Sequence, residues 1–303
     1  MQTVILTGAN RGLGLAIAHA LDDDPGSSLV LAVRDLAAGR AVAARLRRPA
    51  RVVELDVGRL DEVAAFARSW DEPVAALIHN AGLQQTDGLT FTPDGVETTL
   101  AVNHLGPLAL TLGLLPRLTG GVVLGIGSGT HNPENRTATM FGFRGARFSS
   151  VAALARGEIE APGPRQAGMD RYATSKLLSM VTAMALARRV DGVRFLTLDP
   201  GMLPGTSLVR TAPWWVRWSW STVLRALVPV LGDASTPERA AAVVRRLLTD
   251  PNPHRSDVYD RTGAPSTRVW SLARDPALAD RALDESLALL AGRIPTDRIA
   301  GPR

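Results

Sequence analysis

The sequence predicts an α/β protein in which a parallel sheet is covered by helices on both faces. Short, almost continuously apolar segments alternate with longer segments of helical periodicity, and strands without a polar face are typical of parallel sheets buried on both sides. At 303 residues, with 46% hydrophobic and 21% charged residues, the chain has the composition of an ordinary globular domain. We therefore expect a single domain over residues 1–303.

The expected elements follow one another in regular order along the chain. The predicted strands are Val4–Leu6, Leu29–Val33, Val52–Leu55, Ala75–Ile78, Val122–Ile126 and Arg194–Leu198. The predicted helices are Leu13–Leu21, Leu36–Leu46, Pro237–Leu248 and Asp275–Leu290, with Ser235 and Thr236 as candidate N-caps of the third. We also expect an irregular insertion at 131–170 and a helical region at about 201–235.

The first expected strand leads into a glycine-rich loop, Thr7-Gly8-Ala9-Asn10-Arg11-Gly12-Leu13-Gly14, which opens the first helix. Glycines at such a junction let the backbone turn tightly and approach a pyrophosphate, while the helix N-terminus supplies N–H groups and a positive dipole end. The spacing is Gly-x-x-x-Gly-x-Gly rather than Gly-x-Gly-x-x-Gly. The predicted cofactor-binding residues of this loop are Gly8, Asn10, Arg11, Gly12, Leu13 and Gly14.

Arg34 ends the second expected strand, at the place where an acidic residue would bind the ribose hydroxyls of NAD. An arginine suits a 2′-phosphate instead, and Arg11 could add a second positive charge. Asp35 is a complication, because at an irregular strand end it could still face the ribose. We predict that the cofactor is NADP(H).

A tyrosine–lysine pair carries the strongest chemical signal. Arginine supplies 33 of the 34 basic residues, and the one lysine, Lys176, stands four positions after Tyr172, one of two tyrosines in the chain. Residues four apart share a helix face, and a nearby ammonium favours the phenolate, so we expect it to lower a phenol pKa of ordinarily ~10. The compact ammonium suits this role better than a guanidinium. The pair predicts acid–base catalysis; a helix-surface Tyr/Lys pair is the alternative.

These motifs, in this order, resemble those of the short-chain dehydrogenases/reductases from Thr7 to about Thr206. The resemblance implies a doubly wound, Rossmann-type sheet, a nicotinamide cofactor and hydride transfer. It implies that Asn103 holds a proton-relay water, that Ser128 orients the substrate oxygen, and that Tyr172 is the acid/base with Lys176 as its partner. The further cofactor contacts that it implies are Asp56, Val57, Asn80, Ala81, Gly82, Tyr172, Lys176, Pro200, Gly201, Leu203 and Thr206.

Simpler interpretations exist for several of these residues. Asp56 and Asn80 could be ordinary turn residues, and Asn103 could cap or kink a helix. Thr130 is a rival hydroxyl to Ser128, which we prefer because it comes directly off the strand.

Two histidines, His104 and His131, are candidate general acids by residue type, but neither matches a catalytic position of the family. We interpret them as pocket-lining or structural residues. The gap of 44 residues between Ser128 and Tyr172 resembles the retinol-dehydrogenase and protochlorophyllide-reductase-like branch, which handles large apolar substrates. Light-driven protochlorophyllide reduction is not expected, since those enzymes carry cysteines and this chain has none.

Four of the six tryptophans lie within 214–220. Our preferred interpretation is a lid over an apolar substrate pocket. The alternatives are an interfacial helix over 214–231, with Arg217 and Arg225 beside its apolar residues, or a packing helix in the core or a dimer. The two arginines exclude a membrane-spanning helix.

Composition excludes several kinds of site and partner. The net charge is +5 and the arginines are spread along the chain, so no nucleic-acid partner is expected. The absence of cysteine excludes disulfides and thiol nucleophiles, and we see no metal-ligand spacing. The N-terminus has no signal-like segment, so we expect a cytoplasmic protein, and the alanine- and arginine-rich composition suggests a bacterial source.

The sequence thus predicts an NADP(H)-dependent enzyme that interconverts a carbonyl and an alcohol on a bulky, apolar small molecule. One alternative is a C=C reductase that uses the same Tyr172 as proton donor. The other is a non-catalytic NADPH-binding regulator, which would have no need of Ser128, Tyr172 and Lys176 together. Family members often form homodimers, which the insertion could block.

Overall fold

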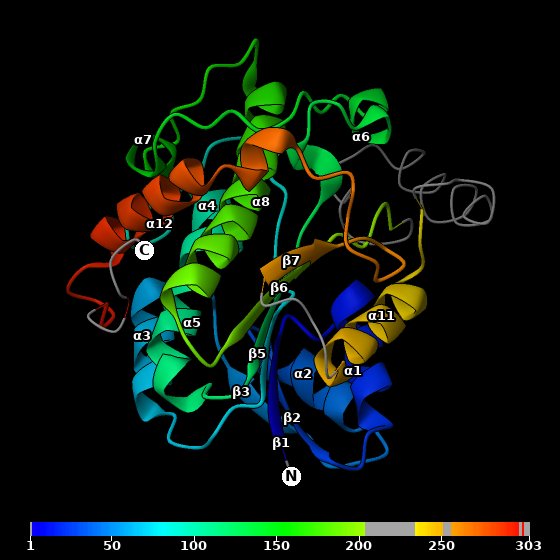
Figure 1. Cartoon of the computed structure of the whole chain (residues 1–303). Helices are drawn as coiled ribbons and strands as arrows, with labels where there is room; N and C mark the ends of the chain where they lie inside the picture. The colour runs from blue at the N-terminus through cyan, green and yellow to red at the C-terminus, as the bar shows by residue number, and fades with distance from the viewer. Residues whose placement is uncertain (1, 204–233, 251–255, 297–298, 300–303) are drawn as a thin grey trace.

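Seven parallel strands form one sheet in the computed structural model, which describes residues 2–203, 234–250, 256–296 and 299 (Figure 1). The strand order is β3-β2-β1-β4-β5-β6-β7, and each neighbouring pair is parallel. The bounds are β1 Gln2–Thr7, β2 Ser27–Val33, β3 Arg51–Glu54, β4 Ala76–His79, β5 Val122–Ile126, β6 Arg194–Leu198 and β7 Ser256–Tyr259. The predicted α/β class and doubly wound parallel sheet are confirmed.

Helices cover both faces of the sheet and create two cores (Figure 1). One face carries α1 Gly12–Asp22, α2 Leu36–Ala43 and α11 Pro237–Thr249. The other carries α3 Leu60–Ser69, α5 Gly106–Leu114 and α8 Pro164–Arg189, with α12 Pro276–Leu290 packed on α8. The strands serve both cores because their side chains alternate: Val4 and Leu6 belong to the first core and Ile5 to the second.

All six predicted strands are present, and a seventh was not predicted. Strand β7 is four residues long and lies at the edge of the sheet, where it pairs with β6 from Phe195↔Ser256 to Leu198↔Tyr259. Its sequence, Ser-Asp-Val-Tyr, is too short and too polar to show the apolar run that marks the inner strands. Its extended conformation depends on the backbone pairing with β6.

The predicted irregular insertion contains short helices. They are α6 Arg136–Met140 and α7 Val151–Ala155, and α8 already begins at Pro164, so the insertion ends earlier than residue 170. Asn135 and Ser150 cap the two short helices by accepting the N–H groups of Ala138 and Ala153. Such local capping is compatible with helices of only five residues because the surrounding chain supports them.

Helix boundaries differ from the predictions by a few residues. Helix α2 ends at Ala43 rather than Leu46. For α11 the predicted cap is confirmed: Thr236 Oγ1 accepts the N–H of Arg239 at 3.2 Å. Among the described residues, one helical stretch, Thr98–Arg117, is long and apolar enough to cross a membrane, and 83% of its most apolar window is buried inside the protein.

Phe195, on β6, is among the largest fully buried side chains, with 1% exposure. Phe195→Ala is expected to lower the free energy of unfolding by about 3–5 kcal/mol, because the lost apolar contacts leave a cavity in the core. Urea denaturation measures the change. The control is Leu272→Ala, since Leu272 is 39% exposed and its loss is expected to change the free energy by less than about 0.5 kcal/mol. Equal effects of the two changes would contradict the described packing.

Candidate active site

Many of the predicted site residues that the structure describes lie at or beyond the carboxyl ends of the strands. The order in which strands are added reverses between β1 and β4. From β1 the chain adds β2 and β3 toward one edge of the sheet, and from β4 it adds β5, β6 and β7 toward the other edge. In open α/β sheets the crevice at such a switch point is the usual ligand site. The glycine-rich loop leaves β1 there, and the Asn80-Ala81-Gly82 turn leaves β4 beside it.

The glycine-rich loop requires glycine at several positions, because a side chain there would strain the backbone or overlap neighbouring atoms. Gly8 and Gly12 have φ values of 68° and 54°, in the left-handed region that favours glycine. A Cβ added to Gly14 would overlap the Gly8 carbonyl oxygen and the Asn80 side chain. The loop therefore presents bare backbone at the N-terminus of α1, which suits a pyrophosphate.

The turn after β4 is fastened to this loop by hydrogen bonds. Asn80 Nδ2 donates to the carbonyl oxygens of Thr7 and Gly8 at 3.0 and 2.9 Å. Thr7 Oγ1 accepts the N–H groups of Asn80 and Ala81 at 3.1 and 3.0 Å and donates to the Ile78 carbonyl. The two loops thus form one unit, and Asn80 has a structural role in it.

At the end of β2, the structure separates the roles of two adjacent charged residues. Asp35 Oδ1 accepts the N–H of Ala38 at 3.0 Å and caps α2, so this carboxylate is engaged with its own helix. The Arg34 side chain is 72% exposed and approaches Asp56 Oδ2 at 3.9 Å. Asp56 in turn caps its own loop by accepting the N–H of Gly58. Val57, also a predicted cofactor contact, is buried in the core.

Ser128 and Tyr172 meet where β5 and α8 come together. Ser128 follows β5, and its hydroxyl faces the phenol of Tyr172 and lowers the pKa of that phenol. Its Oγ also lies 3.0 Å from Thr130 Oγ1. The hydroxyl that contacts the phenol is therefore that of Ser128, as preferred from the sequence, while Thr130 supports it.

The pKa of Tyr172 moves opposite to the prediction from the sequence. Burial raises the pKa of this phenol to about 12, the hydrogen bond from Ser128 opposes the rise, and the negative charge of Asp199 adds to it. Removal from water disfavours the charged phenolate, and this effect exceeds the others. The phenol is therefore fully protonated at neutral pH.

Lys176 lies behind the phenol and is itself buried. Its Nζ donates to the Ile126 carbonyl at 2.8 Å and stands 5.8 Å from the centroid of the Tyr172 ring. Burial lowers the pKa of Lys176 to about 8, while the negative charge of Asp199 opposes that fall. The shared helix face predicted for the two residues is present on α8.

Asn103 lies in a one-turn π-helix, Ala101–Leu105, just before α5. Its side chain accepts the N–H of Leu83 at 2.9 Å, and donates to the Leu83 carbonyl and to Ser175 Oγ at 2.8 and 3.0 Å. A cavity of about 60 Å³ lies behind the site, and its mainly apolar lining includes the polar side chains of Asn103, Lys176 and His79. Its volume has room for an ordered water beside these polar groups.

The environments of His104 and His131, the two histidines considered in the sequence analysis, do not suit a general acid. His104 is buried, burial lowers its pKa to about 3, and its Nε2 lies 2.8 Å from Ser286 Oγ on α12. His131 Nδ1 lies 2.7 Å from the Ser128 carbonyl oxygen. Burial lowers the pKa of His131 too. His104 therefore links the π-helical turn Ala101–Leu105 to α12, and His131 stabilises the turn at Ser128 through its contact with the backbone.

The turn after β6 contributes a residue that the sequence analysis missed. Gly201 has a φ of 71°, and Asp199 Oδ1 accepts its N–H at 3.0 Å. The missed residue is Asp199. Its place directly before the predicted Pro200-Gly201 turn was the feature of the sequence that could have identified it.

Leu203, a predicted cofactor contact, is buried in the core. Thr206 and the stretch 214–231 lie outside the described residues.

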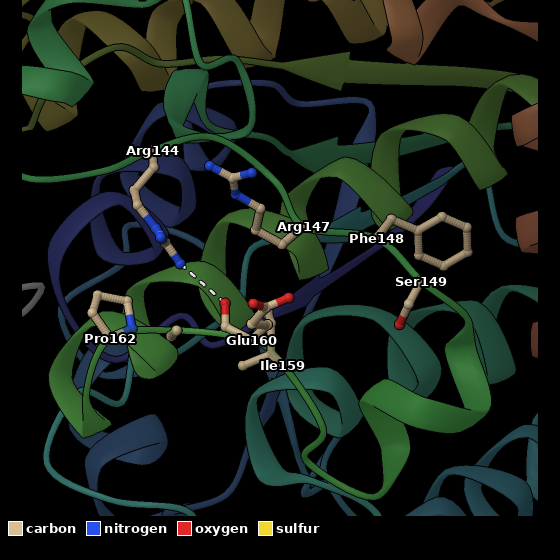
Figure 2. A pocket seen from close by; sticks show the side chains of 8 residues that line it. Arg144, Arg147, Phe148, Ser149, Ile159, Glu160 and Pro162 are labelled. Atoms are coloured by element: carbon tan, nitrogen blue, oxygen red, sulfur yellow. Dashed lines mark hydrogen bonds between the residues drawn. The ribbon is translucent and has the colours of Figure 1, made fainter.

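The insertion passes beside the tyrosine and then forms a hollow of its own. Phe143 lies 6.1 Å from Tyr172, centroid to centroid, and the N–H of Arg147 donates to Thr174 Oγ1 on α8. Figure 2 shows the hollow that the same segment lines, about 660 Å³ in volume. Its walls are Arg144, Arg147, Phe148, Ser149, Ile159, Glu160, Ala161 and Pro162. None of the predicted site residues lines it.

A doubly wound sheet with a glycine loop at its switch point defines a dinucleotide-binding oxidoreductase fold, and comparisons with known proteins agree. Residues 2–141 match the family model of the short chain dehydrogenases. The chain is 30% identical over 308 residues to the short-chain dehydrogenase iccH of Talaromyces variabilis, covering 82% of this chain and 84% of that protein. It is 29% identical over 327 residues to protochlorophyllide reductase B of Oryza sativa subsp. japonica, covering 95% and 78%.

Solved structures with the same fold include an uncharacterized protein from Mycobacterium paratuberculosis. It has a TM-score of 0.72 and 25% identity, with 97% of this chain and 95% of that chain covered. A serine dehydrogenase complexed with NADP+ has a TM-score of 0.56 and 20% identity, with 82% and 90% covered, and shows the shared fold. The protein belongs to the short-chain dehydrogenase family, in the branch that includes the protochlorophyllide reductases.

Gly14→Ala tests the glycine loop as the cofactor cradle. The added methyl group would force the Gly8 carbonyl and Asn80 apart, and overpacking of this kind costs about 1–3 kcal/mol, so affinity for NADPH is expected to fall about ten-fold or more. Fluorescence titration with NADPH measures it. Gly88→Ala is the matched control, because a Cβ at Gly88 meets no atom within 4 Å. An unchanged affinity in folded Gly14→Ala would contradict the assignment.

Proposed function

We propose that the protein is an NADP(H)-dependent reductase of carbonyl groups, with Tyr172 as the proton donor and the alcohol as product. The observation that carries this proposal is the grouping of three side chains: the Ser128 hydroxyl faces the Tyr172 phenol, and Lys176 Nζ lies 5.8 Å from the centroid of the same ring. These three groups together serve no evident packing purpose. A scaffold protein would bury apolar side chains there at lower cost.

The residues around the glycine loop fit a nicotinamide dinucleotide. Gly8, Gly12 and Gly14 leave the backbone N–H groups of α1 accessible, and the Asn80 turn holds the loop in place. When bound, the cofactor supplies the hydride for reduction. Ala81, Gly82, Pro200 and Gly201 belong to the two turns on either side of the crevice, where they would line the cofactor.

Tyr172 and Ser128 would act on the substrate oxygen. A pKa of about 12 keeps Tyr172 protonated, which suits a donor of a proton to an oxygen on which negative charge develops. Ser128 would hydrogen-bond the same oxygen, most strongly where the charge is largest. A protonated tyrosine at rest favours the reductive direction, since oxidation of an alcohol would need a base.

Lys176 and Asn103 would return the proton to Tyr172. With a pKa of about 8, Lys176 is largely an ammonium at pH 7 and stabilises the phenolate that forms when Tyr172 gives up its proton. The cavity behind Lys176, bordered by Asn103, offers space for the water of a relay. Asn103 itself would hold the relay in register through its bonds to the Leu83 backbone.

The NADP(H) preference rests on Arg34 and Asp35. With Asp35 engaged as a helix cap, the exposed charge at the end of β2 is the guanidinium of Arg34. A guanidinium binds a phosphate through paired, charge-assisted hydrogen bonds. Two proteins with the same fold were solved with NADP, the serine dehydrogenase and a metagenomic short-chain oxidoreductase.

A bulky, apolar substrate is the class we favour. Phe143, which the insertion carries, stands beside Tyr172 and gives this side of the site an apolar, aromatic wall. The relatives named protochlorophyllide reductases support a large substrate, and they also favour a second candidate function. In that function the same Tyr172 would protonate carbon during reduction of a C=C bond next to a carbonyl.

Arg34→Ala tests the cofactor preference. Loss of a charge-assisted contact costs about 1.5–3 kcal/mol, so affinity for NADPH is expected to fall roughly ten- to hundred-fold while affinity for NADH stays the same. Competitive fluorescence titration of the two cofactors gives both constants. Arg68→Ala, at another exposed arginine on α3, should change neither. A parallel loss for NADPH and NADH would argue against a 2′-phosphate contact.

Tyr172→Phe tests the proposed function itself. Purified protein is assayed for NADPH oxidation with aldehydes, ketones and enones that range from small to polycyclic. Turnover is expected to fall about 10²- to 10⁴-fold in Tyr172→Phe with NADPH affinity unchanged, because only the proton donor is lost. Tyr259→Phe, the only other tyrosine of the chain, is the control. NADPH binding without turnover of any compound by the parent protein would count against a carbonyl reductase.

A further inference from the structure

Asp199 connects two turns of the site that come from different strands. It follows β6 directly, and its Oδ1 accepts the N–H of Gly201 at 3.0 Å. The carboxylate also faces the N–H of Gly129, the residue after Ser128, and this N–H lowers the pKa of Asp199. The other carboxylate oxygen, Oδ2, lies next to Gly129, 3.0 Å from the position that a Cβ on this glycine would take. One side chain therefore joins the Ser128 turn to the Pro200-Gly201 turn.

The position of Asp199 is itself fixed. Its backbone N–H donates to the Tyr259 carbonyl at 2.8 Å, at the end of the β6–β7 pairing. The Ser128 turn and the Pro200-Gly201 turn each begin within two residues of the end of their strand, β5 and β6. Because the carboxylate contacts both turns, a displacement of the carboxylate would move both. Only a carboxylate offers an acceptor on each of two oxygens; an amide at this place would direct an N–H at one of the backbone N–H groups.

Charged and titratable groups surround this carboxylate from several elements. Lys176 and Tyr172 approach from α8, His131 from the turn after β5, and Asp260 from the end of β7. Burial and Asp260 raise the pKa of Asp199, while the two backbone N–H groups and His131 oppose that rise. Protonation would take an oxygen away from one of the N–H groups, so the geometry favours the ionised form.

We propose that Asp199 is a positioning residue of the reaction, which holds Ser128 and the Pro200-Gly201 turn at a fixed spacing and supplies the counter-charge of the Lys176 ammonium. The catalytic meaning of this role rests on the proposed function. The spacing and the counter-charge exist without turnover and are measurable without a substrate. Lys176 Nζ donates to the neutral Ile126 carbonyl, and Ile126 pairs across the sheet with Leu198, the residue before Asp199. The negative charge of Asp199 at this place favours the ammonium of Lys176.

The single lysine of the chain makes the counter-charge directly observable. Protein labelled with lysine carrying ¹³C at Cε gives one lysine side-chain signal, and its shift against pH reports the pKa of Lys176. A nearby negative charge favours the ammonium, so Asp199→Asn is expected to move the midpoint, about 8 in the parent, to lower pH by about one unit. Asp260→Asn, the same change at a neighbouring carboxylate outside the two turns, should leave the midpoint in place.

Asp199→Glu separates charge from spacing. It keeps the negative charge but is longer by one methylene group, so the Lys176 midpoint should stay near the parent value. NADPH affinity should fall about three- to ten-fold in both Asp199→Asn and Asp199→Glu, because the Pro200-Gly201 turn shifts in both. For any carbonyl that the parent reduces, kcat should fall more than KM changes.

Two results would overturn the inference in protein that circular dichroism shows to be folded. An unchanged Lys176 midpoint in Asp199→Asn would exclude the counter-charge role, and parent-like NADPH affinity in both variants would exclude the positioning role. If the parent reduces no compound of the carbonyl panel, the proposed function fails, but the titration and the NADPH measurements still decide the role of Asp199.

Discussion

The parallel pairing of β1 with β4 is the constraint on which the site depends. These strands are separated in sequence by two strand–helix units, and their register, from Val4↔Ala76 to Leu6↔Ile78, brings the glycine-rich loop beside the Asn80 turn. The contact is so close that Gly14 has no space for a methyl group. Asn80 then bonds to the carbonyl oxygens that this closeness exposes. Every later strand adds its loop to the same edge, so β5 delivers Ser128 and β6 delivers Asp199.

Burial is the largest influence on the charges of Tyr172 and Lys176, and it disfavours the charged form of each side chain. It raises the pKa of Tyr172 to about 12 and lowers that of Lys176 to about 8, so each group is moved toward its neutral form. Ser128 opposes the first shift through a hydrogen bond, and Asp199 opposes the second through its charge. The protein thus keeps a protonated phenol beside an ammonium in a buried setting, which suits proton donation during reduction.

Much of the fold follows from local patterns that the sequence shows directly. Apolar runs marked six of the seven strands, and the Thr236 cap marked the start of α11, because each depends on residues close together in the chain. Strand β7 escaped prediction because its extended form depends on a partner far away in sequence. The predicted fall of the Tyr172 pKa was wrong for a related reason: the spacing to Lys176 was visible, but the degree of burial was not.

By itself the sequence determined the residue types that chemistry requires: glycines where backbone must pass closely, one lysine four positions after a tyrosine, and a serine directly after a strand. Tertiary structure decided which of these groups touch and how strongly they are charged. It turned Asp35 into a helix cap, chose Ser128 over Thr130 as the partner of the phenol, and placed Asp199 between two turns. The physical reason is that backbone sterics and helical spacing act between near neighbours in the chain. Burial and Coulomb interactions depend on distances in space, which only the folded chain defines.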